Sequence, residues 1–239
     1  NHHFKPSFLW DAGPARILPF AIRGVLWYQG ESNSLEPHRV AQHEKLFPLL
    51  VRDWRAQWSQ PRLPFLYCQL SSISTNGGYQ ASCWPEFRDQ QRRFLGTIPN
   101  TGMAVTSDLG ALDDVHPRNK RDVGHRLALW ALAKSYGEKI EFSGPQPQSV
   151  KREDQKLVVQ FSHASRLKTS DGRIARGFEI AGADGVFHDA TAELGEGKVR
   201  LSADEVSQPT AMRYGWKPFS DGNLVSGDGL PASTFEATR

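Results

Sequence analysis

The segment Ile22-Arg-Gly-Val-Leu-Trp-Tyr28, followed by Gln29-Gly-Glu-Ser-Asn-Ser34, decides the fold. A short apolar run that ends in a polar turn is typical of a buried β-strand and the loop at its carboxyl end. From about Pro37 to Trp58, apolar residues recur at helical spacing with charges between them, which predicts a helix that Pro48 bends or divides. The two elements together predict the opening of an α/β unit.

The alternation of strand and helix continues as far as Gly137, which stands as a helix stop. The sequence predicts strands at Phe65–Leu70 and Met103–Ser107, a polar loop at Ser71–Gly78, and helices at about Pro85–Leu95 and Asn119–Tyr136. Strands that alternate with helices form a parallel sheet covered on both faces. We therefore expect an α/β domain in this half of the chain.

After Gly137 the pattern changes to short apolar or alternating runs between Gly and Asp turns, which indicates a β-rich domain. The predicted strands are Lys156–Phe161, Ala175–Ala181, Gly185–Glu193, Lys198–Leu201 and Ala211–Trp216. The change falls near residues 140–146, so we assign an α/β domain to residues 1–143 and a β-rich, sandwich-like domain to residues 144–239. The closing segment Asn223–Phe235 is loop-like and is expected to fold back over the α/β part.

Composition excludes several classes of function. Hydrophobic residues make up 38% of the 239 residues and charged residues 23%, as in soluble globular proteins. The net charge of +3 is too small and too evenly spread for a nucleic-acid-binding protein, and no apolar run is long enough to cross a membrane. Nothing at ligand spacing around His2 and His3 supports a metal site. A disulfide between Cys68 and Cys83 is possible in an oxidising compartment, but the spacing of the two residues does not decide whether it forms.

The first candidate for chemistry is the loop Asp113-Asp-Val-His-Pro117, between the third predicted strand and the last predicted helix. Ester hydrolysis by a serine needs a neutral imidazole as base and a carboxylate that orients it, and a D-x-x-H loop supplies both. The loop follows the carboxyl end of a strand, where open α/β sheets place their sites. The alternative is an Asp-rich surface loop in which His116 caps the helix from Asn119.

The second candidate is the turn formed by Gln29, Gly30 and Glu31, again at the carboxyl end of a strand. A tight glycine turn with amide groups can aim donors at a developing oxyanion, and Glu31 could instead hold the turn together. In the alternative reading, Ser32 or Asn33 caps the helix that follows. Ser32 does not fit a nucleophile, because the second glycine of G-x-S-x-G is missing.

Several motifs together resemble the sialate O-acetylesterase family, and they extend over nearly the whole chain. They are Trp27–Asn33, Leu46-Phe-Pro48, Asp53-Trp-Arg55, Leu63-Pro-Phe65, Gln69-Leu70, Val115–Lys120, Gly124–Ala133, Gly177–Gly185 and Gly229–Ser233. The resemblance implies an SGNH-type hydrolase with a flavodoxin-like sheet and a Ser-His-Asp triad. It also implies removal of O-acetyl groups from sialic acid or a related sugar without a cofactor, in a periplasmic or secreted protein.

Carried over residue by residue, the resemblance makes His116 the triad base and Gln29 and Gly30 the oxyanion turn. The acid is Asp113, Asp114 or the nearby Asp108. The family's nucleophile lies in a Gly-Gln-Ser-Asn segment after its first strand, and residues 1–239 contain no such segment.

The missing serine leads to an expectation about partners. In the flavodoxin-like strand order 2-1-3-4-5, this chain supplies strands three to five, which leaves the apolar edge of Ile22–Tyr28 open. We expect a separate N-terminal chain or segment to pair with that edge and to deliver the serine. Two alternatives stay open: an acetylxylan- or pectin-type acetylesterase, and a non-catalytic carbohydrate-binding chain.

Overall fold

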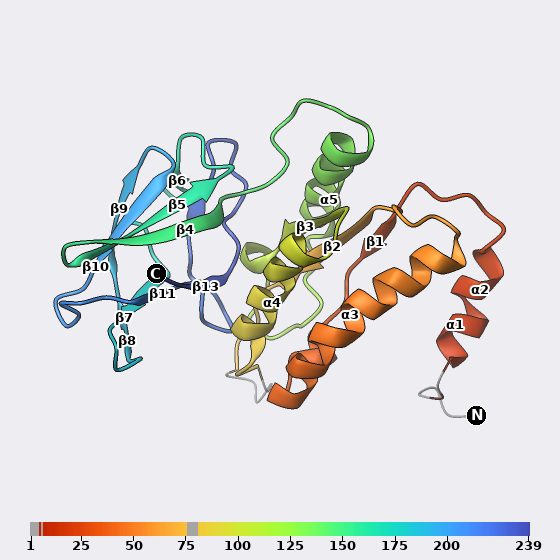
Figure 1. Cartoon of the computed structure of the whole chain (residues 1–239), viewed down its shortest axis with the longest axis horizontal. Coiled ribbons are helices and arrows are strands. Elements are labelled where there is room, and N and C mark those ends of the chain that lie inside the picture. The colour runs from red at the N-terminus through yellow and green to blue at the C-terminus, as the bar shows by residue number, and fades with distance from the viewer. Residues whose placement is uncertain (1–4, 6, 76–80) are drawn as a thin grey trace.

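The computed structural model describes residue 5, residues 7–75 and residues 81–239. His2, His3 and the end of the predicted loop at Ser71–Gly78 lie outside the described residues. The chain begins with two short helices, α1 (Phe8–Ala12) and α2 (Pro14–Ile17), which the sequence did not predict. These helices lie at one end of the molecule and the β-rich part lies at the other (Figure 1). No helix in the described part of the chain is long and apolar enough to span a bilayer.

A three-stranded parallel sheet forms the centre of the α/β part. Its strands are β1 (Val25–Trp27), β2 (Phe65–Gln69) and β3 (Thr101–Val105), in the order β1-β2-β3. Val25 pairs with Phe65, and Phe65 pairs in turn with Thr101, so the three strands start level with one another. All five residues of β2 are buried, as expected for a central strand with helices on both faces. The predicted parallel sheet is confirmed.

Helices cover both faces of this sheet. The helices are α3 (Pro37–Gln57), α4 (Trp84–Thr97) and α5 (Lys120–Ser135), and short 3₁₀ turns lie at Glu31–Asn33 and Ser107–Leu109. Phe47 and Val51 of α3 and Phe94 of α4 pack on Phe65 and Tyr67 of β2. On the other face, residues of α5 pack on Leu66 and Cys68. Pro48 lies inside one continuous α3, so of the two predicted effects the division of the helix is wrong.

Gly102 and Arg55 both have packing roles in this sheet. Gly102 of β3 lets α5 approach closely, because a Cβ there would lie 2.5 Å from the indole of Trp130. The buried Arg55 of α3 donates to the carbonyls of Leu63 and Pro99, at 3.0 and 2.8 Å. Arg55 thereby fixes the end of α3 to the loops that lead into β2 and β3, which supports the sheet rather than any chemistry.

From Gln146 onward the chain is built of antiparallel strands. One sheet has the order β4-β5-β10-β9 and another has the order β13-β11-β7-β8, with a two-stranded pair β12-β6. Their bounds are β4 (Gln146–Glu153), β5 (Lys156–Ser162), β6 (Lys168–Thr169), β7 (Phe178–Ala181), β8 (Phe187–Asp189), β9 (Thr191–Gly195), β10 (Lys198–Ser202), β11 (Ala211–Tyr214), β12 (Leu224–Val225) and β13 (Phe235–Thr238). The segment Gly185–Glu193, expected as one strand, is divided between β8 and β9.

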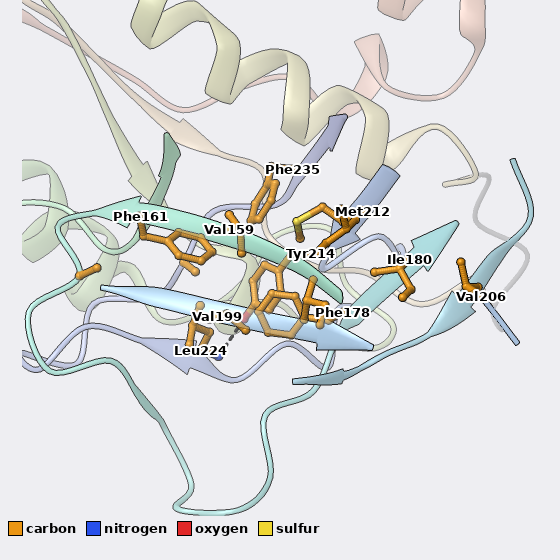
Figure 2. Packing of buried hydrophobic residues seen from close by; sticks show 14 residues of the cluster. Val159, Phe161, Phe178, Ile180, Val199, Val206, Met212, Tyr214, Leu224 and Phe235 are labelled. Carbon is orange, nitrogen blue, oxygen red and sulfur yellow. Dashed lines mark hydrogen bonds between the residues drawn. The ribbon is translucent and has the colours of Figure 1, made fainter. Parts of the chain in front are cut away.

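The β-rich part has a core of its own between its sheets (Figure 2). Val159 and Val199 come from one sheet, and Ile180 and Met212 come from the other, and all four are fully buried. The hydroxyl of Tyr214 accepts a hydrogen bond of 2.8 Å from the backbone N–H of Leu224, which fixes the loop segment around β12 to this core.

The closing segment contacts the α/β part, as expected, although it is less loop-like than its sequence suggests. The side chain of the buried Gln69 at the end of β2 accepts from the backbone N–H of Thr234 at 3.2 Å. A Cβ on Gly144 would lie 1.9 Å from the carbonyl oxygen of Pro231. The chain between α5 and β4 therefore passes directly against the closing segment. Cys68 and Cys83 are both free and buried, so no disulfide joins them.

Candidate active site

The carboxyl ends of β1, β2 and β3 lead into three loops that lie at the same edge of the sheet. The loop after β1 carries Gln29, Gly30 and Glu31, and the loop after β3 carries the Asp113–His116 motif. The loop after β2 runs beside the loop after β3, because Ile73 and Ala111 form a parallel bridge and the N–H of Ser74 donates to the carbonyl of Leu112 at 3.1 Å. The fold therefore places both sequence candidates at the edge where parallel sheets bind ligands.

The imidazole of His116 lies beside Asp114. Its Nδ1 is 3.4 Å from Oδ1 of Asp114, and the same oxygen accepts a 2.8 Å hydrogen bond from the His116 backbone N–H. Asp113 is exposed and forms no hydrogen bond with His116 in the part of the chain that the structure describes. The His116 side chain is 83% exposed, so the imidazole is open to a reactant or a further segment.

Asp108, the third candidate for the acid, is held elsewhere. Its two carboxylate oxygens each accept a 2.6 Å hydrogen bond from the guanidinium of Arg126 in α5. Arg126 also donates to the carbonyl of Val105 at the end of β3, at 2.7 Å. A bidentate pair of this kind is strong and geometrically specific, so Asp108 fixes the start of its loop and is not available to orient His116.

The turn after β1 is closed by its own side chains. Oε2 of Glu31 accepts a 2.9 Å hydrogen bond from the backbone N–H of Gly30, and the Gln29 amide donates to Asn33 at 2.8 Å. Gly30 has a φ of 153°, and a Cβ there would lie 2.6 Å from the ring of Phe87. The position requires glycine, and both donors expected to hold an oxyanion are engaged within the turn in this structure.

Neither expected helix cap is present. Ser32 and Asn33 lie in the 3₁₀ turn, and the residue that precedes α3 is Glu36, which forms no capping hydrogen bond. At α5 the cap is Asn119, whose side chain accepts from the N–H of Asp122 at 3.1 Å. His116 is therefore not the cap of that helix, and its imidazole is left free for another role.

Sequence reasoning missed Tyr28, which directly follows β1 and contacts the start of α5. The ammonium group of Lys120, at the start of α5, lies 4.6 Å from the centre of the Tyr28 ring. Burial raises the pKa of Tyr28 above the usual range of a phenol. The signal available in the sequence was position alone, since Tyr28 directly precedes the Gln29–Glu31 turn.

Comparison with known proteins identifies relatives along most of the chain. Residues 12–133 match the family described as "Carbohydrate esterase, sialic acid-specific acetylesterase". The human sialate O-acetylesterase is 32% identical over 195 residues, which cover 74% of this chain and 36% of that protein. The mouse sialate O-acetylesterase is 36% identical over 163 residues, which cover 61% of this chain and 30% of that protein.

A solved structure agrees in fold. The crystal structure of XAC1771, described as a novel carbohydrate acetylesterase from Xanthomonas citri, superposes with a TM-score of 0.86 at 40% sequence identity. The match covers 92% of this chain and 51% of that one, so it includes both the α/β part and the β-rich part. The chain spans about a third of the length of the curated relatives, at 36% of the human protein. Sequence and fold together place this chain in the sialic acid-specific acetylesterase family of carbohydrate esterases.

Proposed function

We propose that this chain carries the His-Asp half of the active site of a serine-dependent carbohydrate O-acetylesterase. The observation that carries the proposal is the pairing of His116 with Asp114 at the carboxyl edge of the parallel sheet. Asp114 faces Nδ1, which leaves Nε2 as the nitrogen that can accept the proton of an attacking hydroxyl. The family and the Xanthomonas acetylesterase structure support hydrolysis of O-acetyl esters.

The proposed reaction has two steps. A serine Oγ attacks the acetyl carbonyl while His116 takes its proton, and the sugar oxygen then leaves with that proton from His116. Water attacks the acetyl-serine with His116 again as base, and His116 then returns that proton to the serine Oγ as acetate leaves. Asp114 orients the imidazole and stabilises its charged form in both steps. No cofactor takes part.

The turn after β1 is the proposed oxyanion site. Gly30 donates its N–H to Glu31, so this donor serves an oxyanion only when the Glu31 carboxylate moves away. The Gln29 amide, which donates to Asn33, is the second proposed donor. Two donors aimed at the developing charge are the usual arrangement for acyl transfer.

The serine is proposed to come from a segment outside residues 1–239, in the same or a separate chain. Within the described residues, β1 pairs with β2 alone, and its other edge has no strand partner. Leu26 in the middle of β1 is 65% exposed, which is unusual for an apolar strand residue and is explained if a further strand and its helix cover it. An edge of this kind resembles a core cut in two, so the interface should exceed roughly 2,000 Å².

The proposed substrate is O-acetylated sialic acid or a related acetylated sugar, because the family and the human relative are named for sialic acid. Acetylated xylan or pectin is the alternative substrate, since it needs the same chemistry and a different pocket. A periplasmic or secreted location is part of the same proposal.

Two proteins test the proposal: residues 1–239 alone and the full-length enzyme. Hydrolysis of p-nitrophenyl acetate, acetylated sialic acid and acetylated xylan is measured for each. We expect the full-length enzyme to be active with preference for the sialic acid ester, and residues 1–239 alone to be inactive. An active monomer of residues 1–239 would refute the external serine, and an inactive full-length protein that binds sugar would favour the carbohydrate-binding chain.

A further inference from the structure

Arg88 of α4 is a fully buried arginine, and its hydrogen-bond partners among the described residues are all uncharged. Its Nη1 donates to Oγ of Ser72 at 3.2 Å, and its Nη2 donates to the carbonyls of Gly215, at 3.1 Å, and Lys217. Nε is buried and has no hydrogen-bond partner among the described residues. No carboxylate pairs with this guanidinium among the described residues, and burial of an unpaired charge is costly, so its hydrogen bonds to neutral acceptors have to offset that cost. Burial lowers the pKa of Arg88 to about 9.

The three acceptors of Arg88 belong to two parts of the fold. Ser72 lies in the loop after β2, at the catalytic edge of the parallel sheet, whereas Gly215 and Lys217 lie in the loop after β11 of the β-rich part. Arg88 therefore fastens the 215–221 loop onto the edge of the sheet that carries the candidate site. It does so from the interior, where water cannot replace the bonds.

Ser72 is the second member of this junction, and its hydroxyl uses its full hydrogen-bonding capacity. It donates to the carbonyl of Ser107 at 2.6 Å and accepts from Arg88 and from the backbone N–H of Ser220, at 3.0 Å for the latter. A hydroxyl has one donor and two lone pairs, so none is left over. Ser72 thus joins the loop after β2 to the loop after β3 and to the β-rich part at one point.

The junction extends to the loop that carries His116. The N–H of Ile73 donates to the carbonyl of Pro218 at 3.2 Å, while Ile73 also bridges to Ala111. A Cβ on Gly110 would lie 2.0 Å from the carbonyl oxygen of Ser72, so these two loops are in close contact. Residues 215–220, 72–74 and 107–112 therefore lie side by side, and the last of these segments leads directly into Asp114 and His116.

We propose that Arg88 and Ser72 are positioning residues, which use the β-rich part to hold the loop of Asp114 and His116 in its catalytic position. The inference rests on the proposed function, because it concerns the same site. Neither residue touches the reacting atoms. Their effect passes through the 215–221 loop and the 72–74 segment, and it matters because the exposed His116 is paired, in the part of the chain that the structure describes, with Asp114 of the same short loop.

The test uses Arg88→Met, Arg88→Lys and Ser72→Ala in the full-length enzyme, with Val199→Ala as control. Val199 is fully buried in β10, so its substitution lowers stability from a site outside the junction. We expect Arg88→Met and Ser72→Ala to lower kcat on p-nitrophenyl acetate about tenfold or more while KM changes less than about twofold. Arg88→Lys keeps the charge but has three donors in place of five and lacks the planar fork, so it should recover only part of the kcat that Arg88→Met loses. Val199→Ala should lower Tm without changing kcat.

A second readout does not depend on activity. Hydrogen exchange at the amides of Ile73, Ser74 and Ser220 should accelerate about tenfold or more in Arg88→Met, with no change at Val159 and Val199. The proposal is overturned if Arg88→Met keeps the kcat of the unmodified enzyme. It is also overturned if, for an equal loss of Tm, Val199→Ala lowers kcat as much as Arg88→Met does. An inactive unmodified enzyme would defeat the proposed function instead, and the exchange rates would still decide whether the junction couples the two loops.

Discussion

The carboxylate of Asp114, and not that of Asp113, faces the imidazole of His116. One oxygen of Asp114 lies 3.4 Å from Nδ1 of His116 and accepts the backbone N–H of the same residue at 2.8 Å. The D-x-x-H spacing points to Asp113, which is exposed and forms no ion pair with His116 among the described residues. The local turn, in which an Asp side chain bonds the backbone two residues on, is what brings Asp114 to the ring.

His116→Ala should lower kcat of the full-length enzyme by about three orders of magnitude, as removal of a triad base does. The side chain is 83% exposed, so the Tm should change little. Turnover of p-nitrophenyl acetate and a thermal melt measure the two effects. An enzyme that keeps its turnover after this substitution would remove His116 from the mechanism.

The acid is decided by comparing Asp114→Asn with Asp113→Asn. Asp114→Asn should give the larger fall in kcat, because an amide at that position favours the wrong tautomer of His116. Asp113→Asn should stay within about threefold of the unmodified enzyme, since an exposed carboxylate away from the ring contributes little. A larger loss for Asp113→Asn would mean that the loop rearranges in the active enzyme.

The buried His43 should make the stability of the fold depend on pH. Burial lowers the pKa of His43, whose Nδ1 lies 2.8 Å from Oε1 of Gln90 and whose ring packs against those of Phe47 and Phe87. In the unfolded chain its pKa is about 6.5. As the pH falls below that value, the unfolded chain binds the proton first, so stability is lost on the acid side by up to about 1.4 kcal/mol per pH unit.

The measurement is the urea midpoint between about pH 7.5 and pH 5.5, the range that spans the usual histidine pKa. His43→Gln should be less stable at pH 7.5 and should lose much less stability on acidification. Parallel curves for the two proteins would show that His43 is not the group responsible.

Gly30→Ala tests the turn after β1. A Cβ at this position would lie 2.6 Å from the Phe87 ring, and φ is 153°. The substitution should lower the free energy of unfolding by about 2 kcal/mol or more, because backbone strain and overpacking add. Gly137→Ala is the matched control: its φ is 79° with open space around it, so it carries only the backbone cost of about 1 kcal/mol. Equal losses in urea denaturation would contradict the close contact at Gly30.

Periodicity was sufficient to predict the α/β part, because β2 and β3 are continuous apolar runs and α5 has a regular apolar face. It missed β4, whose sequence Gln146–Glu153 is polar and half-exposed at the edge of its sheet. It also missed the short helices α1 and α2, which have no buried residues.

The candidate site divides in the same way. The His116 loop and the Gln29–Glu31 turn were predictable, because each follows a strand directly. The junction of Arg88 and Ser72 was not, since it joins residues such as Ser72 and Ser220 that are 148 positions apart. Local sequence patterns do not predict a contact between residues so far apart in the sequence.

The central claim is that His116 activates a serine from outside residues 1–239. Labelling the full-length enzyme with a serine-reactive fluorophosphonate, followed by peptide mass spectrometry, tests this claim most directly. The account predicts one labelled serine in a peptide outside residues 1–239, with the label lost in His116→Ala. A label on Ser32, or on any other serine within residues 1–239, would contradict it.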